Sequence, residues 1–165
     1  MANEPITIVG INPGTRYLGV AVLKGSQLRE WRIKLVNRNS IEGKVKYVES
    51  IMRKLIERYK PDAVALKKLH PSRSSTNLDR LVQAIRQCAN ERKIKLCEYS
   101  LSKVETLLLH EDKTNRWKLA EYITAPFPVL NRVLRNELNC ANPYYIRMFE
   151  AVALSTACFQ EIECS

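Results

Sequence analysis

The fold of this chain is decided by one stretch, Ile8-Val9-Gly10-Ile11-Asn12-Pro13-Gly14-Thr15-Arg16-Tyr17-Leu18-Gly19-Val20-Ala21-Val22. Residues 6–11 form a short apolar run with β-branched side chains, which is typical of a strand covered on both faces. Pro13 and Gly14 then break the run, and residues 17–23 supply a second one. The stretch therefore predicts two antiparallel strands joined by a tight turn.

A third strand is predicted after a further turn at residues 25–26. Trp31, Ile33 and Leu35 are apolar at alternate positions, and basic residues stand between them. This alternation is the period of a half-exposed strand. Three strands joined by tight turns form an antiparallel meander.

From Ser40 onward the apolar residues recur at spacings of three and four, which is the period of an amphipathic helix. We expect this helix to span residues 40–59, with Ser40 as its N-cap. Beyond it we predict a strand over residues 63–66, a helix capped by Asn77, a strand over residues 94–99 and a mostly helical remainder from Leu101.

A meander followed by alternating helices and parallel strands is typical of the α/β class. We expect a mixed sheet, with a three-stranded antiparallel meander plus two parallel strands, flanked by helices. A length of 165 residues is the size of one domain, so we expect a single domain over residues 1–165. Excursions of the chain from this regular pattern of helices and strands are expected at residues 68–76 and 126–143.

The composition, 45% hydrophobic and 27% charged, is that of an ordinary globular chain. Apolar runs stay well short of the roughly 20 residues that span a bilayer, and residues 1–5 lack the features of a signal peptide. The five cysteines form no Cys-x-x-Cys pair, which favours reduced thiols in a cytoplasmic protein. They are Cys88, Cys97, Cys140, Cys158 and Cys164.

The charge balance points to a polyanionic partner. Lysine and arginine number 27 against 17 acidic residues, which gives a net charge of +10 and a pI near 9.5. A small basic domain attracts polyphosphates and associates with them quickly at low salt.

Three blocks of the sequence together resemble the RuvC family of Holliday-junction resolvases, which have an RNase H-like fold. Residues 8–22 resemble the family's first strand and the Asp-Pro-Gly turn that follows it. Residues 61–67 resemble its Pro-Asp strand, which closes on a catalytic glutamate. Residues 147–154 resemble its last helix, which presents two acidic groups three residues apart. The resemblance implies an RNase H-like domain, a branched-DNA partner and a homodimer.

The resemblance also implies four acidic positions that hold two divalent ions, and this chain departs from three of them. Asn12, Lys67 and Arg147 stand where carboxylates are expected, and Glu150 keeps one. Mg²⁺ requires hard, anionic oxygen ligands, and cations at these positions repel it. We therefore expect a degenerate acidic site with no active catalytic residue and no bound metal or cofactor. The Lys67 ammonium either pairs with Glu150 there or points to solvent beyond the strand end.

Basic residues near the same strand ends are the candidates for nucleic-acid binding. Residues 67–76 combine cations with hydroxyl groups, the usual donors for phosphate contacts. The alternative is an ordinary solvated loop. The candidates are Arg16, Lys68, Arg73, Lys113 and Arg116.

Aromatic residues offer a second kind of nucleic-acid contact. Tyr144, Tyr145 and Trp117 are candidates for base stacking, although aromatic residues at helical spacing more often belong to the core.

The leading hypothesis is a protein that binds branched DNA without cleaving it. The first alternative is a divergent Mg²⁺-dependent endonuclease that uses other carboxylates, such as Glu105, Glu111 or Asp112. The second is a protein-interaction domain. The turn at residues 12–14 also resembles the phosphate loop of actin-like ATPases, but those need two such lobes.

Overall fold

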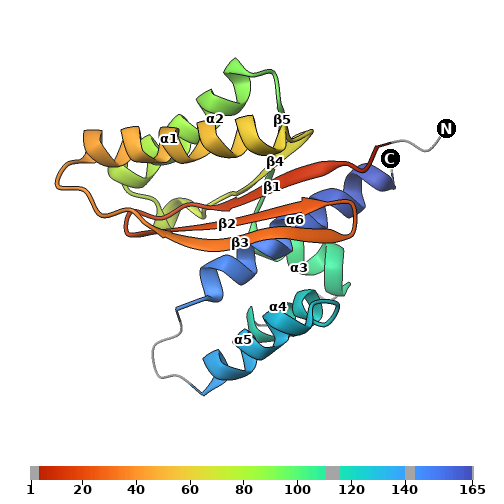
Figure 1. Ribbon diagram of the computed structural model, residues 1–165. Helices are drawn as coiled ribbons and strands as arrows, with labels where there is room; N and C mark the ends of the chain where they lie inside the picture. The colour runs from red at the N-terminus through yellow and green to blue at the C-terminus, as the bar shows by residue number, and fades with distance from the viewer. Residues whose placement is uncertain (1–3, 111–115, 140–143, 165) are drawn as a thin grey trace.

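The computed structural model describes residues 4–110, 116–139 and 144–164. It contains a five-stranded sheet with helices on both faces (Figure 1). The strands are β1 (Thr7–Asn12), β2 (Tyr17–Lys24), β3 (Gln27–Leu35), β4 (Ala63–Lys67) and β5 (Lys95–Tyr99). The helices are α1 (Ile41–Tyr59), η1 (Pro71–Arg73), α2 (Thr76–Glu91), α3 (Leu101–Leu109), α4 (Arg116–Thr124), α5 (Pro128–Leu138) and α6 (Ile146–Glu163).

The sheet has the predicted mixed topology, in the order β3-β2-β1-β4-β5. Strands β1, β2 and β3 pair antiparallel, whereas β4 runs parallel to β1 and β5 runs parallel to β4. Asn12 pairs with Gly19, and Ile11 pairs with Leu66. The ends of β1 and β4 and the beginning of β2 therefore meet at one end of the sheet.

Both faces of the sheet are covered, which explains the apolar runs in the first two strands. Val9 and Ile11 belong to a buried cluster with α1 and α2. Ile8 and Ala21 belong to a second cluster with the helices from α3 to α6. Figure 1 shows these two helical layers above and below the sheet. The alternation along β1 sends successive side chains to opposite faces.

The helix α1 begins where the sequence predicts, and α2 does not. Ser40 is the N-cap of α1, and its Oγ accepts a hydrogen bond from Gly43 N at 3.0 Å. The prediction that Asn77 caps the next helix is wrong. Ser75 is the N-cap instead, because its Oγ accepts a hydrogen bond from Leu78 N at 3.1 Å. Asn77 lies inside the first turn.

The predicted excursion over residues 126–143 is largely helical. Helix α5 occupies residues 128–138 and begins with Pro128. Proline suits this first helical position because its missing N–H has no partner there. Leu130 and Leu134 are buried on one face of α5, so tertiary packing stabilises a helix where the sequence favoured a loop.

Helix α6 lies directly against the sheet because two glycines leave room for its backbone. A Cβ atom built on Gly10 would lie 2.3 Å from the carbonyl oxygen of Ala151. One built on Gly19 would lie 2.4 Å from the carbonyl oxygen of Arg147. Both distances are far below van der Waals contact. The position of α6 therefore requires glycine in β1 and in β2.

Four of the five cysteines fall in the described part of the chain, and all four carry free thiols: Cys88, Cys97, Cys158 and Cys164. Cys140 lies outside the described residues. Cys158 on α6 is fully buried, and burial raises the pKa of its thiol to about 12. That thiol stays protonated at neutral pH and acts as a small apolar group.

Within the described ranges, none of the helices combines the length and the apolar character needed to cross a membrane.

The seating of α6 predicts that alanine at Gly10 or Gly19 destabilises the fold. Each added methyl group would press on the α6 backbone, and overpacking of this kind costs about 1–3 kcal/mol or more. Urea denaturation of Gly10→Ala and Gly19→Ala measures the loss. Gly43→Ala in α1 is the control, because its Cβ would meet the nearest atom, Ser40 Oγ, at 3.2 Å. Unchanged urea midpoints of unfolding for Gly10→Ala and Gly19→Ala would contradict this close contact between α6 and the sheet.

Candidate functional site

Three of the four positions that the sequence predicts as a site come together at the end of the sheet. Asn12 is the last residue of β1, Lys67 is the last residue of β4, and Glu150 lies near the N-terminus of α6. The parallel pairing of β1 and β4 places their ends side by side. Helix α6, seated on the two glycines, brings the carboxylate to the same point.

The Glu150 carboxylate is engaged by both strand ends. Lys67 Nζ lies 2.9 Å from Glu150 Oε2, so the predicted contact between these residues is present. Asn12 Nδ2 donates to the same oxygen at 2.7 Å and lies 3.3 Å from the Arg147 carbonyl oxygen. The side chains of Lys67 and Glu150 are 19% and 12% exposed, and Asn12 is 2% exposed. A buried carboxylate needs such partners.

The fourth position, Arg147, lies beside the turn between β1 and β2. A Cβ built on Gly14 would lie 2.7 Å from Arg147 Nη1, so the guanidinium group rests against this glycine. From the other side Lys44 Nζ donates to the Thr15 carbonyl oxygen at 2.8 Å. The turn is therefore held between a cation from α6 and a cation from α1.

The residues at this end of the sheet do not fit a divalent metal ion. Mg²⁺ needs near-octahedral, anionic oxygen ligands, and the Glu150 carboxylate at this end of the sheet is already paired with the Lys67 ammonium. In the described part of the chain no three His, Cys, Asp or Glu side chains form a group that could hold a metal. Glu105 lies on α3, and Glu111 and Asp112 lie outside the described residues.

Two of the predicted basic residues lie at the same end of the sheet. Arg16 is exposed in the turn between β1 and β2. Lys68 is exposed directly after β4, and its backbone N–H donates to the Tyr99 carbonyl oxygen at 2.7 Å. Arg73 is exposed a few residues further on, at the end of η1.

The structure does not describe the side chains of the other two predicted basic residues. Lys113 lies outside the described residues. Arg116 begins α4, and its side chain is not described.

The hydroxyl groups of the loop after β4 serve local structure, which the sequence analysis did not foresee. Ser75 Oγ caps α2, and Ser74 Oγ donates to the Asp79 carboxylate. Ser72 Oγ lies 2.7 Å from His70 Nδ1. These serines shape the loop, and its cations are left as the candidates for phosphate contacts.

An acidic residue that the sequence analysis missed lies behind the N-terminus of α6. Glu137 on α5 is only 6% exposed, and its Oε2 accepts hydrogen bonds from Tyr144 N at 2.6 Å and Tyr145 N at 3.0 Å. Its spacing from Leu130 and Leu134 is that of a buried helix face. An acidic residue at an apolar position of a helical pattern is the signal that would have revealed it.

Comparisons with known proteins agree with this architecture. The family model described as crossover junction endodeoxyribonuclease RuvC matches residues 8–126. A search of curated protein sequences finds no match.

Three solved structures share the fold over nearly the whole chain. The Thermus thermophilus RuvC structure superimposes with a TM-score of 0.74 and 16% identity, covering 96% of this chain and 97% of that one. T. thermophilus RuvC in complex with Holliday junction substrate superimposes with a TM-score of 0.75 and 17% identity, covering 96% of both chains. The yeast mitochondrial Holliday junction resolvase Ydc2 superimposes with a TM-score of 0.70 and 9% identity, covering 97% of this chain and 80% of that one.

Identities this low establish the fold alone, so the family rests on the sequence model. That model spans the meander, β4, β5 and the helices as far as the end of α4. It stops before α6, and the position of Glu150 therefore rests on the structure. Because the match covers well over half of the sequence, this chain belongs to the RuvC family.

Proposed function

We propose that this RuvC-family protein binds branched DNA and does not cleave it. The observation that carries the proposal is the contact of Lys67 Nζ with Glu150 Oε2 at 2.9 Å, with the Asn12 amide on the same oxygen. The one carboxylate among the four family positions is thereby paired inside the protein.

Loss of cleavage follows from the chemistry that phosphodiester hydrolysis needs. Two divalent ions held by carboxylates activate the water and stabilise the leaving oxygen. At this site a metal would have to displace the Lys67 ammonium and then face Lys67 and Arg147, whose positive charges repel it. The residues present favour an internal ion pair over a metal.

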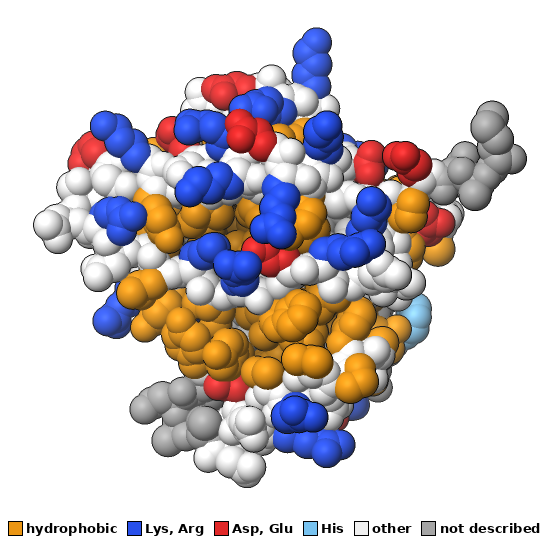
Figure 2. Space-filling model, in the orientation of Figure 1, with side chains coloured by type: hydrophobic (Ala, Val, Ile, Leu, Met, Phe, Trp, Pro, Cys, Tyr) orange, Lys and Arg blue, Asp and Glu red, His pale blue; other side chains and the backbone are white. Residues whose placement is uncertain are grey.

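Retained DNA binding is supported by the position of the basic residues. Arg16 and Lys68 are exposed at the end of the sheet where the acidic site of the family is expected, and Arg73 follows close behind. The whole chain carries a net charge of +10. Figure 2 shows Lys and Arg side chains gathered over the sheet and α1 on the face in view. Such cations bind phosphates without reading sequence.

Branched DNA is the preferred substrate in this proposal because T. thermophilus RuvC, which shares the fold, has been solved with Holliday junction substrate. A homodimer would offer two copies of the basic surface to a two-fold junction. The homodimer, the single domain over residues 1–165 and the cytoplasmic location stay predictions.

The internal ion pair predicts energetic coupling between Lys67 and Glu150. Glu150→Gln should lower the free energy of unfolding by about 1–3 kcal/mol, because it leaves the Lys67 ammonium partly buried without its carboxylate. Adding Lys67→Met should restore part of that loss, because it removes the uncompensated charge. Urea denaturation of the four proteins in this cycle measures the coupling.

The surface pair Arg80–Glu42 is the control for this cycle. Its Nη1 and Oε1 atoms lie 3.2 Å apart, but its side chains are 46% and 66% exposed. Glu42→Gln with Arg80→Met should show weaker coupling, because water screens exposed pairs. If the changes in the free energy of unfolding caused by Lys67→Met and Glu150→Gln simply add, the ion pair is contradicted.

The basic loop predicts salt-dependent binding to a four-way junction. The logarithm of the affinity should fall linearly with the logarithm of salt concentration, with a slope of about −0.9 per phosphate neutralised. Lys68→Ala with Arg73→Ala should flatten the slope by up to about two units, because two phosphate contacts are lost. Gel shifts over a salt series in Mg²⁺ measure both the affinity and the integrity of the strands.

A variant with the same loss of charge at the other end of the sheet is the control. Lys24 ends β2 and Lys95 begins β5, so both lie away from the site. Lys24→Ala with Lys95→Ala should leave the slope near that of the unaltered chain. Cut junction strands would establish the divergent nuclease instead. Failure to shift a junction, a duplex or an RNA hairpin would favour the protein-interaction domain.

A further inference from the structure

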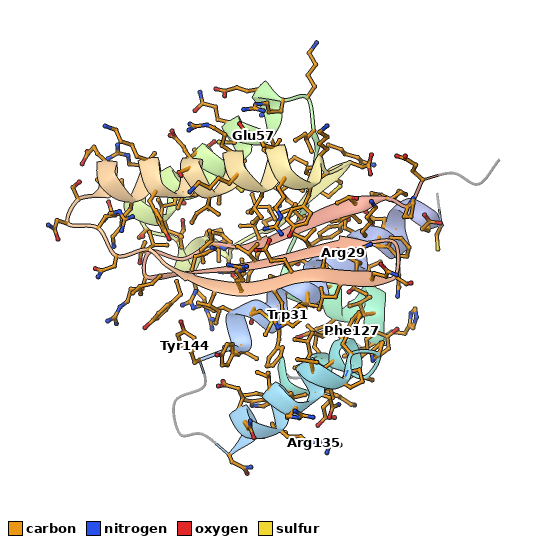
Figure 3. All side chains as sticks on the ribbon, in the orientation of Figure 1. Arg29, Trp31, Glu57, Phe127, Arg135 and Tyr144 are labelled. Carbon is orange, nitrogen blue, oxygen red and sulfur yellow. The ribbon has the colours of Figure 1, made fainter. Side chains whose placement is uncertain are left out.

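Two exposed tyrosines stand at the N-terminus of α6, beside the site. Tyr144 is 43% exposed and Tyr145 is 39% exposed. Their ring centroids lie 5.0 Å apart, and Tyr144 also meets Tyr17 at 5.5 Å, both in edge-to-face geometry. Figure 3 shows Tyr144 beneath the end of the sheet where β2 begins. The three rings form one cluster that continues from the turn between β1 and β2.

The backbone of Tyr144 and Tyr145 is held in place by a buried carboxylate. The buried Glu137 carboxylate accepts hydrogen bonds from both of their amides, at 2.6 and 3.0 Å. The Tyr145 carbonyl oxygen in turn accepts from Met148 N and Phe149 N, which starts α6. The rings are thus presented to solvent on a rigid support, and little conformational entropy is lost when they bind a partner.

Cations flank the cluster on both sides along the chain. Arg16 is exposed directly before Tyr17, and Arg147 follows Tyr145 by two residues with its guanidinium against Gly14. Exposed aromatic rings beside cations that contact the backbone are the combination that binds single-stranded nucleic acid. A base that stacks on a ring here would have its phosphates near Arg16.

We propose that Tyr144 and Tyr145, supported by Tyr17, form a stacking platform for an unpaired base of the bound DNA. The inference rests on the proposed function, since it names the part of branched DNA that this surface takes. Figure 2 shows an apolar surface below the sheet, and a protein partner is the competing occupant for exposed rings. The flanking arginines favour the nucleobase.

The test uses a junction that carries 2-aminopurine at an unpaired position next to the branch point, together with a fully paired duplex. The unaltered protein should quench 2-aminopurine fluorescence on binding. Tyr144→Leu with Tyr145→Leu should abolish the quenching and weaken junction affinity about tenfold or more, because each stacked base is lost. Duplex affinity and the slope of affinity against salt should stay unchanged, because stacking releases no counterions.

Three further variants make the test specific. Tyr144→Phe with Tyr145→Phe should behave like the unaltered protein, because phenylalanine stacks as well. Tyr122→Leu removes a tyrosine that is 45% exposed on α4 and should change neither quenching nor affinity. Should the double leucine variant fail to fold, Tyr145→Leu alone, which leaves the contact of Tyr144 with Tyr17 in place, should still reduce quenching.

The outcomes separate this inference from the proposed function. Junction binding with unchanged affinity and quenching in the leucine variants would overturn the platform and leave DNA binding in place. Equal losses on junction and duplex would also overturn it, because the rings would then not select an unpaired base. Failure of the unaltered protein to bind either DNA would overturn the proposed function itself.

Discussion

The close approach of α6 to the sheet is the constraint on which the rest of the structure depends. Gly10 and Gly19 lack the side chains that would hold the helix away, so the backbone carbonyls of Ala151 and Arg147 rest directly on β1 and β2. This contact fixes how far α6 reaches beyond the strand ends. It delivers Glu150 to Asn12 and Lys67, and it places Tyr144 and Tyr145 beside the first turn.

The same constraint explains how the site stays ordered with a different chemistry. Carboxylates crowded at one point repel one another unless cations separate them. Here the Asn12 amide and the Lys67 ammonium both contact the Glu150 carboxylate. The charges of Lys67 and Glu150 balance within the protein, and this ion pair ties the end of β4 to α6. The arrangement at these strand ends is therefore an internal ion pair with one amide hydrogen bond.

Much of the fold could be predicted because its signals are local. The turn at Pro13 and Gly14 and the cap at Ser40 act within a few residues, and both occur as expected. Asn77 failed as a cap because the Ser75 hydroxyl accepts a hydrogen bond from Leu78 N and begins the helix before Asn77 is reached. Helix α5 falls within the remainder that was predicted as mostly helical, and its buried Leu130 and Leu134 hold it in place where an excursion was expected.

The site was predicted in part and for a different reason. The contact of Lys67 with Glu150 follows from the family resemblance together with the need of a buried charge for a partner. The support of Tyr144 and Tyr145 by Glu137 could not be foreseen, because it depends on where the end of α5 meets the residues that precede α6. The most direct test of the central claim is an anomalous difference map from Mn²⁺-soaked crystals. Asn12→Asp with Lys67→Glu, which restores two carboxylates, is the matched control and should show a peak at the strand ends. The unaltered chain should show none within coordination distance of Glu150, and a peak there would contradict the account.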